Sequence, residues 1–190
     1  MCGKTNIAKA VASVTGVPYF KATSEHDSYL SSKVSKREAF LNQLRYADPR
    51  VFDVLKQTGH SIIFDRGYPC ELAYSLVMKR ETDNTMLVHM DEMWASLGAK
   101  VVFCRRSDYS GIVDDLDPSI GAETLAKLDA AYDHFAEVTK AKVYKLNVDD
   151  EDINREVDEV LEFMGYDAID RLTMLSQMMG LYDKGETTHA

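Results

Sequence analysis

Short apolar runs alternate with longer stretches of helical periodicity along the chain. The runs of strand length lie near residues 17–21, 61–65, 101–105 and 142–146. Between them, apolar residues recur every three or four positions, which is the pattern of a helix with one buried face. Strands that alternate with helices in this way form a parallel sheet with helices on both faces. The pattern therefore predicts a three-layer α/β fold.

The helical stretches begin and end at residues typical of helix boundaries. Helices are predicted over residues 6–14, 36–47, 49–58, 69–80, 85–97, 123–139 and 152–164, with a further short one within 167–182. Four of them are expected to end at a glycine: Gly16, Gly59, Gly98 and Gly165. Asp48 is expected to cap the helix that Pro49 begins. The periodicity also predicts that Val54 and Ile153 lie on buried helix faces.

Polar and charged side chains recur where the predicted strands end. Lys21 and Glu25 come at or after the end of the first strand, and Asp65 and Arg66 end the second. Arg105 and Arg106 end the third strand, and Asn147 follows the last one. Ligands of parallel α/β sheets bind beyond the carboxyl ends of the strands. The sequence therefore predicts a binding site at this edge of the sheet.

The opening residues carry half of a phosphate-binding pattern. Gly3, Lys4 and Thr5 match the second half of G-x-x-x-x-G-K-[ST], in which backbone N–H groups and the lysine bind phosphates and the hydroxyl holds Mg²⁺. The helix predicted from Asn6 would place its positive N-terminal end beside the anion. The first half of the pattern is absent, and a three-residue match also occurs at ordinary helix starts.

Composition narrows the class of protein without indicating a reaction. The 190 residues are 45% hydrophobic and 28% charged, as expected for one globular domain. No apolar run is long enough to span a bilayer, which predicts no membrane partner. Cys2, Cys70 and Cys104 lack metal-site and disulfide spacing and are typical of reduced thiols in the cytoplasm. The net charge of −9 argues against nucleic acid as a partner.

Two stretches give the sequence a specific resemblance. They are LRYAD at residues 44–48 and SIIFDRGYPCELAY at residues 61–74. Both resemble thymidylate kinases and the related deoxynucleoside kinases, P-loop nucleotide kinases in which a buried strand ends in Asp-Arg before an aromatic residue and a helix. The order of P-loop helix, base-binding helix, Asp-Arg strand, lid and final strand is kept over nearly the whole chain. The chain is most similar to the short kinases of this group that bacteriophages carry.

The resemblance implies a role for each matching position, with ATP and Mg²⁺ as cofactors. On the donor side it implies nucleotide binding by Gly3, Lys4, Thr5, Asn6 and Asn147, and metal binding by Thr5 and Asp65. On the acceptor side it implies substrate binding by Lys21, Arg45, Tyr46, Arg50, Arg66 and Tyr68. Arg105 and Arg106 would stabilise charge on the transferring phosphoryl group, as lid arginines do. The implied activity is ATP-dependent phosphorylation of a deoxynucleoside monophosphate, with a dTMP-like acceptor favoured.

The residues leave other acceptors and functions open. Glu25 is a candidate catalytic base, and a carboxylate base suits the neutral hydroxyl of a nucleoside better than an anionic monophosphate. A deoxynucleoside kinase, or a kinase of a modified pyrimidine in DNA, therefore stays as an alternative. A non-catalytic nucleotide-binding protein, or an inactive truncated fragment, is the alternative of another class. A homodimer is also left open.

The candidate site residues have structural alternatives as well. Asp65 and Arg66 could end a strand and pair with each other, and Tyr46 could belong to the core. Arg105 and Arg106 could be solvated surface residues. Asp114, Asp115 and Asp117 are interpreted as a solvated loop and not a metal site, because nothing orders them. The five histidines show no metal-ligand spacing and are given no role.

The resemblance also implies a domain organisation, that of the P-loop nucleoside-phosphate kinase fold. We expect one kinase domain over residues 1–182, a lid over 107–118 that closes over bound substrates, and a flexible tail over 183–190. In this fold the strand before the phosphate loop is central, between the strands near 61–65 and 101–105. We therefore expect this first strand to be missing from the sequence, and the working protein to carry about ten more residues before Met1 that form it.

Overall fold

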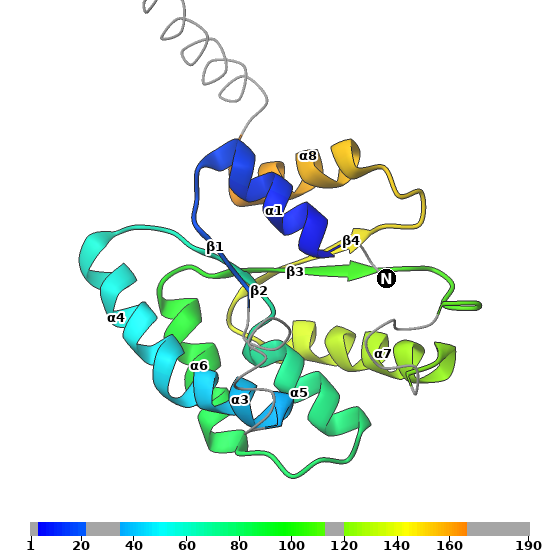
Figure 1. Ribbon diagram of the computed structural model, residues 1–190, viewed down its shortest axis with the longest axis horizontal. Helices are drawn as coiled ribbons and strands as arrows, with labels where there is room; N and C mark the ends of the chain where they lie inside the picture. The colour runs from blue at the N-terminus through cyan, green and yellow to red at the C-terminus, as the bar shows by residue number, and fades with distance from the viewer. Residues whose placement is uncertain (1–3, 22–34, 113–119, 167–190) are drawn as a thin grey trace, which may run out of the picture.

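A computed structural model describes residues 4–21, 35–112 and 120–166 as a mixed α/β protein (Figure 1). In chain order the elements are α1 (Lys4–Thr15), β1 (Tyr19–Lys21), α3 (Lys36–Asn42), the π-helical segment η1 (Gln43–Ala47), α4 (Asp48–Thr58), β2 (Ile63–Asp65), α5 (Tyr68–Val77), α6 (Asn84–Ser96), β3 (Lys100–Arg105), α7 (Ala122–Val138), β4 (Lys142–Asn147) and α8 (Ile153–Met164). Strands occur in all four predicted places, which confirms the α/β class.

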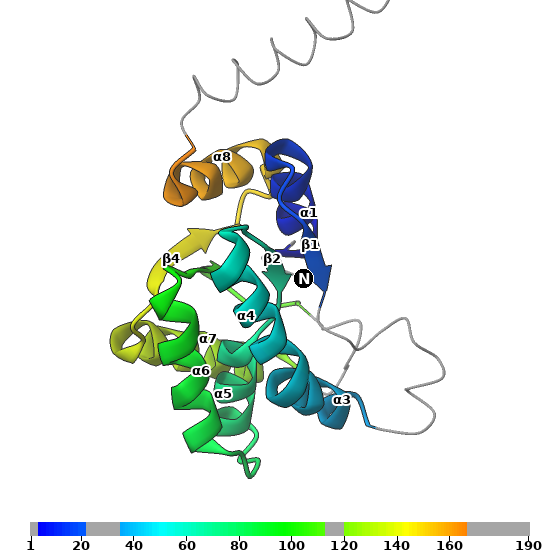
Figure 2. The ribbon, with the colours of Figure 1, turned by 90° about the vertical axis from the view of Figure 1, so that its left-hand side faces the viewer.

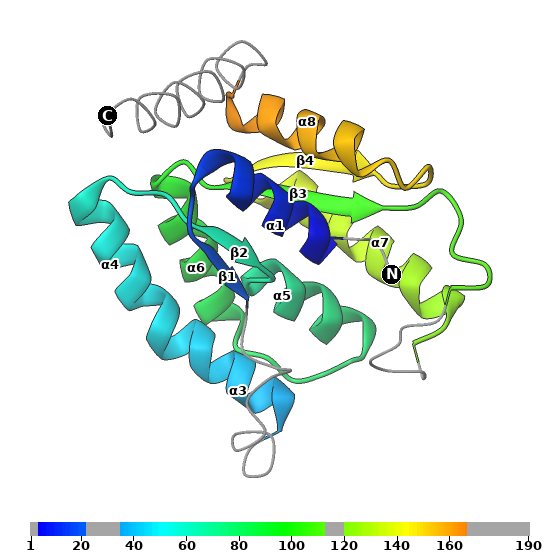
Figure 3. The same cartoon turned by 45° about the horizontal axis from the view of Figure 1, so that its top comes forward.

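The strands form two separate parallel pairs. β1 pairs with β2, with Tyr19 opposite Ile63, and β3 pairs with β4, with Lys100 opposite Lys142. Among the described strands, β2 and β3 are not hydrogen-bonded to each other. The interruption falls between the two strands that the sequence analysis expected to flank an absent one. The strands of both pairs run in the same overall direction (Figure 3).

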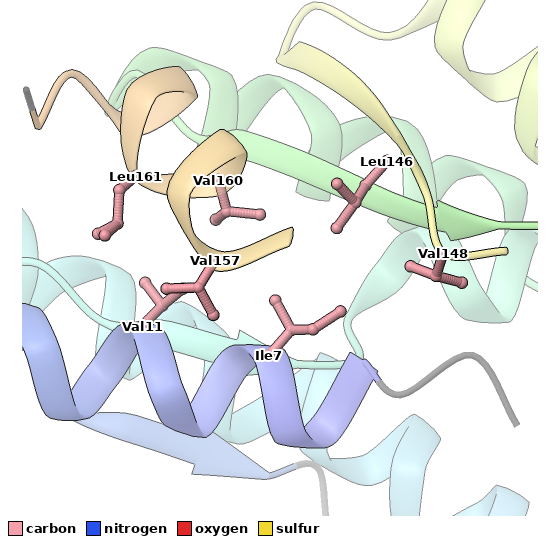
Figure 4. Close-up of a cluster of buried hydrophobic side chains, with 7 residues drawn as sticks. All are labelled: Ile7, Val11, Leu146, Val148, Val157, Val160 and Leu161. Carbon is pink, nitrogen blue, oxygen red and sulfur yellow. The ribbon is translucent and has the colours of Figure 1, made fainter. Parts of the chain in front are cut away.

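One buried cluster lies between the strands and the helices α1 and α8 (Figure 4). Its members are Ile7, Val11, Leu146, Val148, Val157, Val160 and Leu161. Ile63 of β2 and Val102 of β3 both pack against it, although their strands are unpaired. The two half-sheets, the β1–β2 pair and the β3–β4 pair, are therefore covered on this face by one continuous apolar layer.

A second cluster covers the opposite face. It consists of Leu44, Tyr68, Leu87, Met90, Met93, Trp94 and Phe135. Phe64 of β2 and Phe103 of β3 pack against this cluster. Figure 2 shows the resulting layers, with α1 and α8 on one side of the strands and α3 to α7 on the other. Helices on both faces of parallel strands match the predicted arrangement.

The junction before α4 differs from the prediction. Asp48 does not cap a new helix, because its backbone is helical (φ −59°, ψ −42°) and α3, η1 and α4 run on without a break. Pro49 explains the π-helical turn: its ring would clash with the carbonyl group four residues earlier in an α-helix. The Asp48 N–H instead donates to the Gln43 carbonyl, five residues back, which is the π-helical pattern.

Two residues predicted to be buried are exposed. Val54 on α4 is 56% exposed and Ile153 on α8 is 38% exposed. Both lie at the edge of an apolar stripe, where periodicity alone does not tell a buried from a solvent-facing position. The predicted helix ends are confirmed at Gly59 and Gly165, whose φ angles of 69° and 91° are those that favour glycine.

Candidate functional site

Every described strand ends in a polar residue. Lys21, Asp65, Arg105 and Asn147 are the last residues of β1, β2, β3 and β4. The carboxyl ends of parallel strands meet at one edge, so the polar residues predicted to gather there do share that edge. The contacts of each then decide which of them are available to a ligand.

A hydrogen bond joins the start of α1 to the end of β2. The Thr5 hydroxyl Oγ1 donates to Asp65 Oδ2 over 2.6 Å, and the Tyr19 hydroxyl donates to the same oxygen over 2.9 Å. Asp65 is 4% exposed, so its carboxylate is held in place by two hydroxyl donors in a mostly dry setting. Thr5 and Asp65 lie 60 residues apart in sequence, and the fold brings together the two residues predicted to bind a metal ion.

The N-terminal end of α1 faces the same place. Its first backbone N–H groups have no partner within the helix, and the aligned peptide dipoles give this end a partial positive charge. The first turn contains no acidic residue that would neutralise it. Lys4 and Asn6 are exposed there. An anion beside Thr5 would therefore meet backbone donors and a lysine, whereas Gly3 lies outside the described residues.

Arg66 follows Asp65 in a strained, half-buried position. Its φ of 79° is in the left-handed region, which residues other than glycine rarely adopt. Burial lowers the pKa of the guanidinium, but the nearby Cys70, Tyr74, Tyr132 and Asp65 outweigh this effect and raise the pKa overall. Within the described part of the chain, it forms no ion pair with Asp65 or any other carboxylate. Among the described residues, Arg66 is thus a cation at the end of β2 that has no carboxylate within ion-pair distance, although the charge of Asp65 acts on it.

Arg105 and Arg106 both have acidic partners. Arg105 Nη2 lies 2.7 Å from Asp129 Oδ2 and its Nη1 lies 3.3 Å from Asp133 Oδ1, both on α7. Arg106 Nη2 lies 2.5 Å from Glu151 Oε1. These contacts give both residues a structural role in this state. To act on a phosphoryl group, either arginine would have to leave its carboxylate partner and bind phosphate oxygens in its place.

The residues predicted to contact a base lie on an exposed part of η1 and α4. Arg45, Tyr46 and Arg50 are all exposed, and Tyr46 is 65% exposed, which removes it from the core. Lys21, which ends β1, is half-buried. No described contact joins the three exposed residues to Thr5 or Asp65, so their substrate role stays a prediction.

Tyr68 is part of the core. It is buried, its ring packs edge-on against Phe135, and its hydroxyl donates to Asp91 Oδ1 over 2.7 Å. Burial and the Asp91 hydrogen bond raise the pKa of the hydroxyl. The aromatic residue after Asp-Arg therefore holds α5 against α6, and the structure gives it no contact that points to a substrate.

Asn147 lies in a polar cluster beyond β4. Its side-chain amide donates to Asp149 Oδ2 over 2.9 Å, and the Ser107 N–H donates to Asp149 Oδ1 over the same distance. The cluster ties the first residue of the predicted lid to the loop after β4. Glu25 and lid residues 113–118 lie outside the described residues.

A buried carboxyl at the start of α4 was missed by sequence reasoning. Asp48 is buried and accepts a hydrogen bond from Gln43 Nε2 over 3.2 Å. Burial raises its pKa to about 6, and the Gln43 hydrogen bond offsets part of the rise. The signal in the sequence was an Asp-Pro pair within an unbroken apolar periodicity, which is compatible with a π-helical turn as well as with a helix start.

The described residues contain no group of three or more His, Cys, Asp or Glu side chains placed to hold a metal ion. They also contain no helix with the length and apolar character needed to cross a membrane. Comparison with protein-family models and with curated protein sequences finds no match.

Proposed function

We propose that the protein is an ATP-dependent nucleotide kinase that phosphorylates a deoxynucleoside monophosphate, with a dTMP-like acceptor favoured. The observation that carries this proposal is the hydrogen bond of 2.6 Å between Thr5 and Asp65, at the start of α1 and the end of β2. A hydroxyl directly after a lysine, beside a buried carboxylate, at a helix N-terminus, is the arrangement that P-loop kinases use for phosphate and metal. The proposal includes the P-loop kinase fold.

The donor set of Thr5 and Asp65 fits Mg²⁺. This ion is commonly held by one or two protein oxygens, with waters and substrate phosphates completing its shell, so no larger protein cluster is required. Thr5 Oγ1 and the Asp65 carboxylate would hold it. When bound, Mg²⁺ supplies charge neutralisation for phosphate oxygens. Tyr19 fixes the Asp65 carboxylate through the second hydroxyl donor.

The protein's own residues would then position two phosphate groups. Lys4 and the N–H groups of α1 bind the phosphates of ATP. Arg66 grips the phosphate of the acceptor, where its planar fork matches two phosphate oxygens. The lack of a carboxylate partner for Arg66 among the described residues supports an anionic acceptor over a neutral nucleoside. Burial of Asp65, and partial burial of Arg66, limits the competition of water for these contacts.

The ion pairs of Arg105 and Arg106 favour one second candidate, nucleotide binding without phosphoryl transfer. In that case both arginines would keep their carboxylate partners when ATP binds. In a kinase, at least one would leave its partner and stabilise the charge on the transferring group. The assay described next separates the two functions.

The test is phosphoryl transfer from Mg²⁺-ATP to a panel of deoxynucleoside monophosphates and deoxynucleosides. We expect transfer to monophosphates, with dTMP the best acceptor. Asp65→Asn should lower kcat/KM by about 100-fold or more, a loss of about 3 kcal/mol of transition-state stabilisation. Asp53→Asn, at an exposed position on α4, is the matched control and should match the unaltered protein.

Three results would count against this function. Mg²⁺-ATP binding without transfer to any acceptor supports the non-catalytic candidate. Transfer to deoxynucleosides alone supports a nucleoside kinase, with Glu25 as its candidate base. Equal activities of Asp65→Asn and Asp53→Asn would show that the carboxylate beside Thr5 has no role in transfer.

A further inference from the structure

Tyr19 lies on the face of β1 that α1 covers. It pairs with Ile63 in the parallel ladder, and paired residues of neighbouring strands place their side chains on the same face. Ile63 packs against the apolar cluster beneath α1 and α8, and Asp65, two residues further along β2, shares its face. Phe20 faces the other way, because its ring contacts Phe64, which packs against the opposite cluster. The Tyr19 hydroxyl therefore reaches the Asp65 carboxylate from the side on which α1 lies.

Four side chains of α1, β1 and β2 form a closed ring of contacts. The hydroxyls of Thr5 and Tyr19 both donate to Asp65 Oδ2, over 2.6 Å and 2.9 Å. The Lys9 ammonium lies 5.9 Å from the centre of the Tyr19 ring, within the range of a cation–π interaction. Thr5 and Lys9 are four residues apart on α1, so they lie on the same side of the helix. The ring of contacts ties the N-terminal end of α1 to the end of β2 by way of β1.

The two hydroxyl donors differ in their place in the proposed site. Thr5 is at the N-terminal end of α1, where its oxygen would also bind the metal ion. Tyr19 is the first residue of β1, and no motif assigns it a role. A carboxylate that binds a metal ion keeps its orientation through further hydrogen bonds of this kind. Asp65 is 4% exposed, so water has little access to replace a donor that is removed.

We propose that Tyr19 is a positioning residue that acts through Asp65. Its hydroxyl holds the carboxylate in the orientation that binds the metal ion of a metal–nucleotide complex, without contacting the metal or the nucleotide itself. This inference rests on the proposed function, because it needs Mg²⁺-ATP to bind beside Thr5. It applies to nucleotide binding with or without phosphoryl transfer.

The test measures how much of the ATP affinity depends on the metal ion. Tyr19→Phe removes the hydroxyl and keeps the ring. ATP binding to the full chain is measured by titration calorimetry, once with excess Mg²⁺ and once with EDTA. With Mg²⁺ the Kd should rise by about tenfold or more, as is typical when a group that orients a metal ligand is removed. With EDTA the Kd should change by less than about twofold, because Lys4 and the N–H groups of α1 bind phosphate without the metal.

Tyr144→Phe is the matched control. Tyr144 on β4 is half-buried like Tyr19, and its hydroxyl also donates to a carboxylate, Glu159 Oε2, over 2.8 Å. Both Kd values of this variant should equal those of the unaltered protein. Urea unfolding of each variant, followed by circular dichroism, shows that the protein used in the titrations is folded.

Tyr19→Leu separates the hydroxyl from the ring, because it removes both. If the hydroxyl positions Asp65, Tyr19→Phe should already show the weakened Mg²⁺-ATP binding of Tyr19→Leu. If Tyr19→Phe binds Mg²⁺-ATP like the unaltered protein and only Tyr19→Leu is weakened, Tyr19 has a packing role and the inference is overturned.

Two further results are decisive. Weakening of the same size with Mg²⁺ and with EDTA would show that Tyr19→Phe disturbs the start of α1 in general, and it would overturn the inference while leaving the proposed function in place. If Mg²⁺ does not strengthen ATP binding by the unaltered protein, the proposed metal site fails and this inference fails with it. Weakening of Tyr19→Phe confined to Mg²⁺, with Tyr144→Phe unchanged, supports the positioning role.

Discussion

At Arg66 the backbone conformation favours glycine, whereas the proposed activity requires the arginine side chain. A φ of 79° costs a non-glycine residue about 1 kcal/mol, which a glycine would not lose. Arg66→Gly should therefore not lower the free energy of unfolding, measured by urea denaturation. The same variant should lower kcat/KM for a monophosphate acceptor by about 30-fold or more. A variant that loses stability while keeping its activity would show that the arginine is retained for packing.

The side of the site that Arg66 serves can be tested separately. Arg66→Ala should raise the acceptor KM and lower kcat, a loss of about 2–4 kcal/mol in transition-state stabilisation, while ATP binding stays nearly unchanged. Arg66→Lys keeps the charge but loses the planar fork, so it should recover only part of the loss. If ATP affinity falls and acceptor kinetics do not, Arg66 contacts the donor nucleotide.

Some of these residue contacts could be predicted from sequence and others could not. Thr5 and Asp65 were expected to meet because the resemblance to P-loop kinases implies that both bind the same metal ion, whereas apolar periodicity placed them only at a helix start and at a strand end. The hydrogen bond from the Tyr19 hydroxyl to Asp65 was missed, because a tyrosine in a three-residue strand is counted as an apolar residue in the strand pattern. Tyr68 was given a substrate role by resemblance, whereas its ring packs against Phe135 and its hydroxyl binds Asp91.

At the scale of elements, the sequence located the strands but not their pairing. Each strand is a short apolar run, and such runs are visible without any tertiary information. Pairing depends on which edges meet in space, and alternation along one strand carries no information about its neighbour. The same limit applies to η1, where local rules for Asp-Pro predicted a helix start. Instead of starting a new helix, the chain continues through a π-helical turn. The Asp48 side chain is buried there, which is a tertiary effect that local rules do not include.

The buried Asp48 makes the junction of η1 and α4 a source of pH-dependent stability. In the folded protein its pKa is about 6, whereas an unfolded aspartate titrates near about 4. Between these values the folded state binds more protons than the unfolded state, so stability falls as pH rises. Relative to Asp48→Asn, the unaltered protein should lose about 2–3 kcal/mol between pH 4 and pH 7, measured by urea denaturation.

A matched substitution separates this effect from general charge effects. Asp53 is exposed on the same helix, so Asp53→Asn should keep the pH dependence of the unaltered protein. If Asp48→Asn and the unaltered protein have parallel stability profiles over this range, the carboxyl is ionised in the folded state at little cost.

At the scale of the whole molecule, helices rather than a continuous ladder join the two half-sheets. The cluster beneath α1 contacts β2 through Ile63 and β3 through Val102, and it includes Val11, which has 2% of its surface exposed. Val11→Ala should lower the free energy of unfolding by about 2 kcal/mol, through lost burial and the cavity that remains. Val14→Ala, at a position 37% exposed on the same helix, gains the same helix propensity and should cost less than about 0.5 kcal/mol.

Two probes of the same unfolding reaction show whether the two helical layers unfold as one cooperative unit. Trp94, the single tryptophan of the chain, lies in the cluster on the face opposite α1, so its fluorescence reports on the far layer, whereas circular dichroism reports on all helices. In the unaltered protein and in Val14→Ala, the two urea transitions should coincide. In Val11→Ala both should shift together to lower urea, because the layers share β2 and β3. A fluorescence transition that stays in place while the circular dichroism transition moves would mean that the layer of α1 and α8 unfolds independently of the layer around Trp94, so that β2 and β3 do not couple the two layers.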